Sequence, residues 1–65
     1  YMVFKSRREG YDVRIIKESC KFKEQIINEE CKDKIEDLIY ADANGKLCCT
    51  KTIDGAIKLI EYNEQ

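Results

Sequence analysis

Four cysteines are the residues of this sequence best suited to chemistry, because thiols can form disulfides, bind metal ions or act as nucleophiles. They are Cys20, Cys31, Cys48 and Cys49. Zinc sites usually take ligands from two short C-x2-C knuckles, whereas the spacings here are ten residues, sixteen residues and none. On a strand, Cys48 and Cys49 would point to opposite faces. We therefore expect four free thiols and no metal site, with two disulfides in a secreted protein as the alternative.

Other catalytic groups are scarce. The chain has no histidine, which is the commonest general base in enzymes. Three hydroxyl side chains have no base beside them in any motif: Ser6, Ser19 and Thr52. The three glycines match neither a phosphate-binding loop nor a dinucleotide fingerprint. We expect no enzymatic activity and no cofactor.

Positive charge is concentrated towards the N-terminus, although the net charge of the chain is −1. Residues 1–23 carry seven basic and three acidic side chains, and residues 24–65 carry five and ten. Basic groups interleaved with aromatic rings could neutralise phosphates while the rings stack on bases. The candidate binding residues are Phe4, Lys5, Arg7, Arg8, Tyr11, Arg14 and Lys17. The alternative is that these arginines pair internally with acidic side chains of the following helix.

These candidates belong to a predicted N-terminal β-hairpin. Residues 2–8 and 11–17 alternate in character and include β-branched and aromatic side chains, which favour strands. Gly10 allows a turn between them, because glycine accepts a positive φ without penalty. We expect Lys5 and Arg7 to point outward, with Arg14 on the same face of the neighbouring strand.

Residues 20–41 predict an amphipathic helix, the longest element of the chain. Apolar side chains recur at positions 22, 26, 27, 31, 35, 38 and 39, which trace one helical stripe. Asn44-Gly45 would provide a left-handed stop. An alternative ends the helix near Lys34 and makes residues 35–41 a strand of a second hairpin around Asn44-Gly45. The unbroken stripe favours the long helix.

The last part of the sequence predicts a short strand over residues 47–50 and then a helix that ends near Tyr62. Thr52 is a suitable N-cap, and Asp54 lies in the first turn, where the helix dipole favours an acid. The expected buried face consists of Ile53, Ala56, Ile57 and Ile60.

Together these elements predict a small α+β domain over residues 1–65. The expected order is β-β-α-β-α, with a small antiparallel sheet made of the N-terminal hairpin plus one or two further short strands, covered by two helices. No apolar run approaches the roughly 20 residues of a membrane span, and we expect a cytoplasmic protein. We expect Met2 to be the native start, preceded by one added residue, with a fragment of a longer protein as the alternative.

The absence of catalytic groups favours a small protein-interaction module, such as a regulator or inhibitor that docks on a larger protein. Lysine outnumbers arginine nine to three and isoleucine outnumbers leucine nine to three, a usage common in AT-rich genomes of bacteria and phages. The alternative function is nucleic-acid binding through the basic N-terminal hairpin. A symmetric homodimer is a third expectation, because a sheet covered on one face exposes the other.

Overall fold

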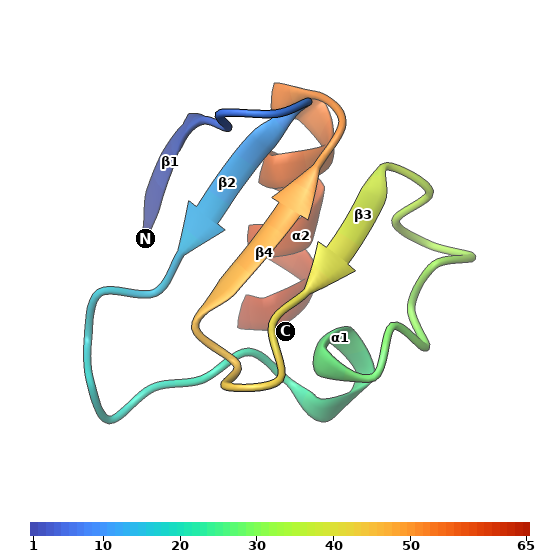
Figure 1. Cartoon of the computed structure of the whole chain (residues 1–65). Coiled ribbons are helices and arrows are strands. Elements are labelled where there is room, and N and C mark those ends of the chain that lie inside the picture. The colour runs from blue at the N-terminus through green and yellow to red at the C-terminus, as the bar shows by residue number, and fades with distance from the viewer.

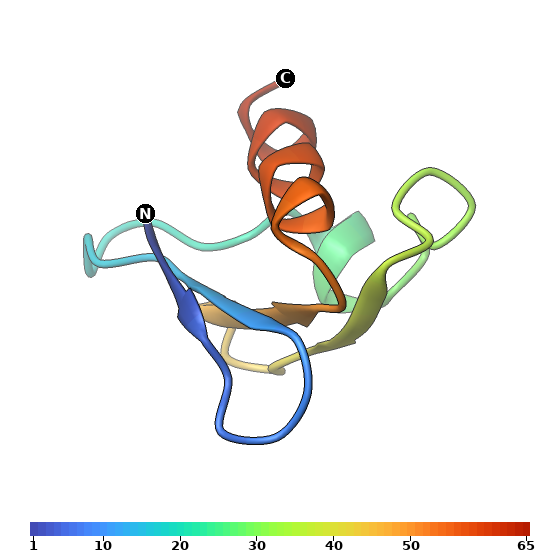
Figure 2. The same ribbon diagram turned by 90° about the horizontal axis from the view of Figure 1, so that it is seen from above.

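The computed structural model describes all 65 residues and has an α+β architecture. Its elements are β1 (Met2–Lys5), β2 (Tyr11–Arg14), α1 (Glu24–Ile27), β3 (Leu38–Ala41), β4 (Leu47–Thr50) and α2 (Ile53–Glu64). The four strands form one antiparallel sheet in the order β1-β2-β4-β3 (Figure 1). Both helices lie on the same side of this sheet, and the other face carries no helix (Figure 2). Neither helix has the length and apolar character needed to cross a membrane.

The register of the strands divides their side chains between the two faces. Val13 of β2 lies opposite Cys48 of β4, and Asp12 lies opposite Cys49. Because side chains alternate along a strand, Val13 and Cys48 face the helices, whereas Asp12 and Cys49 face away from them. The expectation that the two adjacent cysteines occupy opposite faces is confirmed.

The hydrophobic core lies between the helix-bearing face of the sheet, α2 and the segment that joins β2 to β3. Its ten buried residues are Val13, Ile15, Phe22, Ile26, Cys31, Ile35, Leu38, Cys48, Ala56 and Leu59. Burial of one such aliphatic or aromatic side chain contributes about 1.5–3 kcal/mol. Cys49 is also buried but belongs to the opposite face, outside this core.

The predicted helix over residues 20–41 is wrong, because α1 ends at Ile27 after a single turn. The amide of Glu29 donates to the carbonyl of Ile26, and the amide of Glu30 donates to the carbonyl of Gln25. With Glu29 at a φ of 59°, these bonds form a Schellman motif, which closes a helix at its C-terminus. Five of the seven apolar residues in the stripe are buried, and their burial did not require them to be helical.

The alternative prediction, a second hairpin around Asn44-Gly45, is confirmed. Gly45 has a φ of 74°, and its amide donates to the carbonyl of Asp42 at 2.9 Å. This turn joins β3 to β4, so the element order is β-β-α-β-β-α rather than β-β-α-β-α. The strand over residues 47–50 is present as predicted.

Helix α2 begins as predicted, and its predicted buried face is confirmed at Ala56 and in part at Ile60, which packs against the core, but not at Ile53 and Ile57. The side chain of Thr52 accepts a hydrogen bond from the amide of Gly55 at 3.0 Å and therefore caps the helix. The buried residues are Gly55, Ala56 and Leu59, while Ile53 and Ile57 are about half exposed. A Cβ atom on Gly55 would lie 2.6 Å from the Cβ of Asp37. The absence of a side chain at Gly55 thus lets α2 approach the start of β3, which turns the two isoleucines towards solvent.

Candidate functional site

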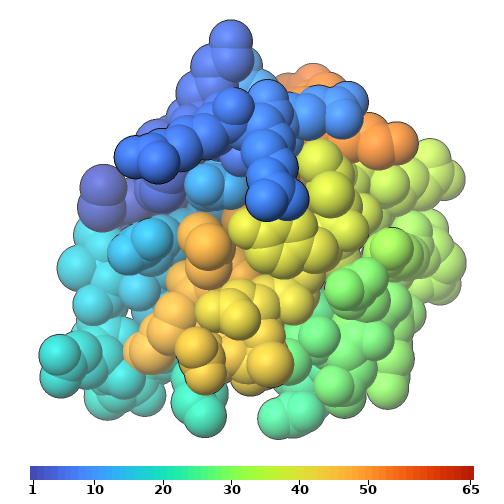
Figure 3. Space-filling model, viewed as in Figure 1, coloured from blue at the N-terminus to red at the C-terminus, as the bar shows by residue number.

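A hollow of about 770 Å³ lies on the face of the sheet that carries no helix. We call it the sheet hollow. Figure 3 shows the loop of the N-terminal hairpin, in blue, lying over the sheet beside the yellow atoms of β3. The lining residues come from this hairpin and from β3 and β4; they are Phe4, Lys5, Ser6, Arg7, Arg8, Glu9, Asp12, Arg14, Ile39, Tyr40 and Cys49. The sheet hollow is therefore built by segments distant in sequence.

The hairpin loop that overhangs the hollow is held in place at Gly10. The amide of Ser6 donates to the carbonyl of Gly10 at 2.9 Å, and the amide of Arg8 donates to the hydroxyl of Ser6 at 3.3 Å. Gly10 has a φ of 85°, and a Cβ atom there would lie 2.1 Å from the carbonyl oxygen of Thr50. Only glycine permits this close approach of the loop to β4.

A β-bulge places Tyr40 in the hollow. Leu38 lies opposite Thr50 and Tyr40 lies opposite Cys49, so Ile39 is an extra residue on β3. In a regular strand Leu38 and Tyr40 would share a face, but the extra residue moves Tyr40 to the face without helices. Both Ile39 and Tyr40 then line the hollow. Bulges commonly redirect side chains in this way next to binding sites.

The floor of the hollow combines a carboxylate and a thiol. The Oδ1 atom of Asp12 is buried and has no hydrogen-bond partner. Cys49 is 2% exposed, and its thiol donates a weak hydrogen bond to the carbonyl oxygen of Glu9 at 3.5 Å. Burial, and then the neighbouring carboxylate of Asp12, raise the pKa of Cys49 above the usual value of a thiol. A protonated and shielded thiol is a poor nucleophile, so this floor does not favour cysteine chemistry.

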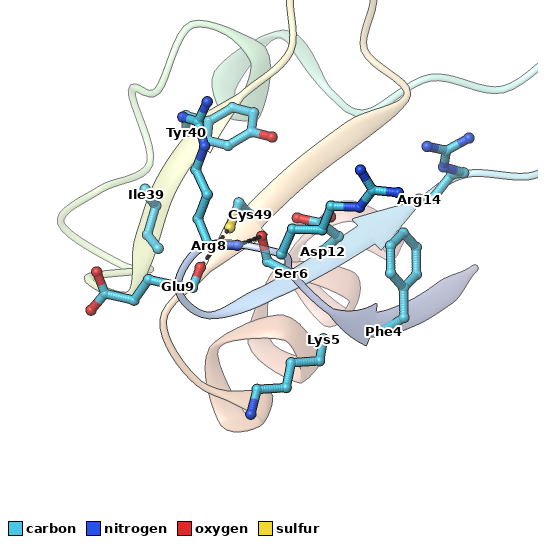
Figure 4. A pocket seen from close by; sticks show the side chains of 11 residues that line it. Phe4, Lys5, Ser6, Arg8, Glu9, Asp12, Arg14, Ile39, Tyr40 and Cys49 are labelled. Atoms are coloured by element: carbon cyan, nitrogen blue, oxygen red, sulfur yellow. Dashed lines mark hydrogen bonds between the residues drawn. The ribbon is translucent and has the colours of Figure 1, made fainter.

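Tyr40 and Arg8 form one side of the hollow. Figure 4 shows the side chain of Arg8 extending from the hairpin towards the ring of Tyr40. Burial raises the pKa of the Tyr40 hydroxyl, and the negative charge of Asp12 raises it further, while the guanidinium of Arg8 acts in the opposite direction. The phenol therefore stays neutral and can donate a hydrogen bond to a bound group.

All three arginines of the chain line the sheet hollow. The structure contains one ion pair, between Lys32 and Glu29 at 3.1 Å, so no guanidinium group is ion-paired with a carboxylate. The alternative interpretation, in which these arginines pair with acidic side chains of the following helix, is therefore wrong. Four basic and two acidic residues line the hollow, which gives a charge of +2 in a chain whose net charge is −1.

Five of the seven predicted binding residues line the hollow: Phe4, Lys5, Arg7, Arg8 and Arg14. Lys5 lies at its margin, and its side chain extends away from the others (Figure 4).

The other two predicted residues lie elsewhere. Tyr11 pairs with Lys5 on the helix-bearing side of the sheet, and Lys17 belongs to a loop beyond β2. The expectation that Lys5 and Arg14 share a face is wrong. Arg14 lies opposite Met2, and Met2 and Lys5 are three positions apart on β1, so their side chains point to opposite faces of the sheet.

Six lining residues were not predicted: Ser6, Glu9, Asp12, Ile39, Tyr40 and Cys49. The alternation of Asp12 and Arg14 around the buried Val13 was a readable signal for Asp12, since it places both on the face opposite Val13. Cys49 carries the same signal relative to Cys48. The sequence held no such signal for Tyr40, because the position of its side chain depends on the bulge in β3.

The remaining thiols do not assemble into a site. Burial, and then the neighbouring Cys31, raise the pKa of Cys48 to about 12, and burial also raises the pKa of Cys31. No group of three or more cysteine or carboxylate side chains is arranged to hold a metal ion. Comparison with protein-family models, curated proteins and solved structures finds no match to this chain. The chemistry of the sheet hollow is therefore the basis for a functional proposal.

Proposed function

We propose that this protein is a small non-catalytic interaction module that docks on a larger protein through the sheet hollow. The partner presents an acidic segment to the three arginines. The observation that carries this proposal is that every arginine of the chain lines one hollow and none has a carboxylate partner. A cytoplasmic location and a role as a regulator or inhibitor belong to the same proposal.

Arginine is well suited to this task. Its planar guanidinium group binds carboxylates in a bidentate manner and is more weakly hydrated than the ammonium group of lysine. The chain places eight of its nine lysines outside the hollow and all three arginines inside it. Such a distribution supports recognition of a defined anionic group over a general attraction to negative charge.

The remaining surface of the hollow resembles the centre of a protein interface in composition. Phe4 is 38% exposed and Tyr40 is 42% exposed, although both are aromatic. Arginine and the aromatic residues are enriched in protein interfaces, and arginine, tyrosine and tryptophan are enriched among the residues that dominate the binding energy. The unpartnered Oδ1 atom of Asp12 adds an acceptor that a backbone amide or a cationic side chain of the partner would satisfy.

Single-stranded nucleic acid is the second candidate ligand, and one observation favours it. Phe4 and Tyr40 both lie on the open face of the sheet beside the arginines. Aromatic rings on such a surface can stack on bases, at about 1–3 kcal/mol per base, while arginines bind the phosphates. The net charge of the chain, −1, weighs against nucleic acid, because dedicated nucleic-acid-binding proteins usually carry an excess of positive charge.

Photo-crosslinking in the cells of origin tests these two functions. A photoreactive phenylalanine analogue would replace Tyr40 in one variant and Ile57 on the opposite side of the molecule in a matched control. We expect one main protein adduct from position 40, no such adduct from position 57, and loss of the adduct when Arg8→Glu and Arg14→Glu are combined with the probe.

The alternative outcomes are distinct. An adduct at position 40 that nuclease digests would establish nucleic acid as the ligand and overturn the proposed protein partner. Equal adducts at positions 40 and 57, or none at 40, would show that the sheet hollow is not the binding surface. Circular dichroism of the doubly substituted protein serves as the folding control, and we expect it to be unchanged because Arg8 and Arg14 are exposed.

A further inference from the structure

The sheet has two edge strands, β3 and β1, and they differ in how well they are protected from pairing with another chain. The bulge at Ile39 interrupts the regular ladder of β3, which is one of the ways in which proteins keep an edge strand from pairing with another chain. The other edge is β1, which has no bulge and no proline. All four residues of β1 are exposed, and three of them are apolar: Met2, Val3 and Phe4. A regular, exposed and apolar edge strand is a template for pairing.

The hydrogen-bond pattern shows which backbone groups of β1 are free. The amide of Ser6 donates to the carbonyl of Gly10, so the Ser6–Gly10 pair belongs to the hydrogen-bonded set of the hairpin. Hydrogen-bonded and non-bonded pairs alternate in an antiparallel ladder, which assigns Met2 and Phe4 to the bonded set. The amides and carbonyls of Val3 and Lys5 therefore point away from β2, towards the open edge.

We infer that β1 is a dimerisation strand that pairs in an antiparallel manner with β1 of a second copy of this chain. The two-fold axis passes between Val3 and the partner's Val3. In this register the two valines exchange backbone hydrogen bonds. Met2 lies opposite the partner's Phe4, and Tyr1 lies opposite the partner's Lys5.

The side chains of β1 are self-complementary in this register. The Met2 thioether and the partner's Phe4 ring lie on the face without helices, where sulfur and aromatic groups attract each other. The side chain of each Lys5 lies opposite that of a tyrosine, so no two side chains of like charge are opposed.

Two other registers are less favourable. Pairing centred on Lys5 would place two lysines opposite each other, which destabilises a sheet. Pairing centred on Phe4 would place Val3 opposite the partner's Lys5 and Met2 opposite the partner's Ser6, which loses apolar contacts. The register centred on Val3 is therefore the one that we assign.

The dimer would contain one continuous sheet of eight strands, because antiparallel pairing of two edge strands joins their sheets. Its two-fold axis is perpendicular to the sheet, so the helices of both copies lie on one side and the two sheet hollows share the other. If the proposed function holds, each dimer then offers two binding sites to one partner. The dimer itself does not depend on that function.

Cysteine crosslinking tests the assigned register. A Cys20→Ser background removes the exposed native thiol, and the other three cysteines are 0–2% exposed. In this background we would compare Val3→Cys, Phe4→Cys and, as a control far from the edge, Ile16→Cys. All three native side chains are at least 38% exposed, so the variants should fold. Under a mild oxidant we expect Val3→Cys to form disulfide-linked dimers at least about tenfold faster than the other two.

Sedimentation equilibrium provides a second measurement on the unmodified chain. We expect a concentration-dependent dimer, since a single strand pair makes a small interface. Val3→Lys would oppose two charges at the axis and weaken the dimer at least about tenfold without unfolding the half-exposed site. A wild-type chain that stays monomeric to about 1 mM would overturn the proposal. The proposal would also be overturned if Val3→Cys crosslinked no faster than Ile16→Cys. If Phe4→Cys crosslinked faster than Val3→Cys, the assigned register would be wrong.

Discussion

At the scale of single residues, Lys46 has the most extensive set of contacts among the charged side chains. Its ammonium donates to the carbonyl oxygens of Lys17 at 3.0 Å, of Glu18 at 2.6 Å and of Cys20. These carbonyls belong to the long connection that leaves β2, and Lys46 belongs to the turn before β4. The ammonium group of Lys46 therefore links the irregular segment after β2 to the turn before β4.

We predict that Lys46→Met lowers the free energy of unfolding by about 1–2 kcal/mol, because three carbonyls lose a charged donor while the aliphatic stem is retained. Urea denaturation measures this change. Lys51→Met is the matched control on an exposed lysine and should stay within about 0.5 kcal/mol of the wild type. Equal effects of the two substitutions would mean that the ammonium of Lys46 does not hold the connection.

At the scale of elements, the decisive feature is the end of α1. Glu29 adopts a left-handed backbone conformation, which costs an L-residue other than glycine about 1–2 kcal/mol. The Schellman hydrogen bonds and the burial of Cys31 and Ile35 beyond them offset this cost. Helix α1 therefore ends at Ile27, and the residues that would have continued it include strand β3.

Substitution of Glu29 distinguishes this arrangement from a continuous helix. We predict that Glu29→Gly is more stable than Glu29→Ala by roughly 1 kcal/mol, since glycine tolerates a positive φ and both variants lose the same ion pair with Lys32. Paired urea denaturation curves give the difference. If residues 20–41 formed one helix, the sign would reverse, because glycine costs about 1 kcal/mol relative to alanine inside a helix.

At the scale of the whole molecule, the sheet separates two environments for thiols. Cys31 and Cys48 contribute to the core between sheet and helices, and Cys49 lies beneath the hairpin on the other face. Burial is the main cause that raises the pKa of all three above the usual value of 9.0, and the pKa of Cys48 reaches about 12. The folded protein thus keeps protons that the unfolded chain releases in alkaline solution.

This difference predicts an alkaline loss of stability. Above about pH 9 the unfolded chain ionises its thiols while folded Cys48 stays protonated up to a pKa of about 12, so the unfolded state binds fewer protons. The Cys48 thiol should therefore leave the free energy of unfolding unchanged below about pH 9. Above that pH it should lower the free energy of unfolding by about 1.4 kcal/mol per pH unit.

Urea denaturation under reducing conditions, from about pH 8 to about pH 11, measures this slope. Cys48→Ala is less stable at every pH, because it leaves a small cavity, but its alkaline slope should be shallower than that of the wild type. Parallel pH profiles for the two proteins would contradict the assignment of the slope to Cys48.

Several features of this protein were determined by the sequence itself, because they depend on neighbours along the chain. Alternation predicted the hairpin and the opposite orientations of Cys48 and Cys49, and Thr52 predicted the start of α2. Clustering of positive charge predicted four of the residues that line the sheet hollow, and the aromatic ring interleaved with them predicted a fifth, Phe4. Each of these signals acts over a few residues, where steric and hydrogen-bonding preferences are strong.

The tertiary structure alone decided the remaining features. An apolar stripe is compatible both with a long helix and with a turn followed by a strand, and pairing of β3 with β4 selected the second. The approach of Gly55 to Asp37 set the buried face of α2, and the bulge at Ile39 brought Tyr40 to the hollow. Over residues 20–41 the local pattern indicated which residues become buried, but contacts between distant segments chose the backbone that buries them.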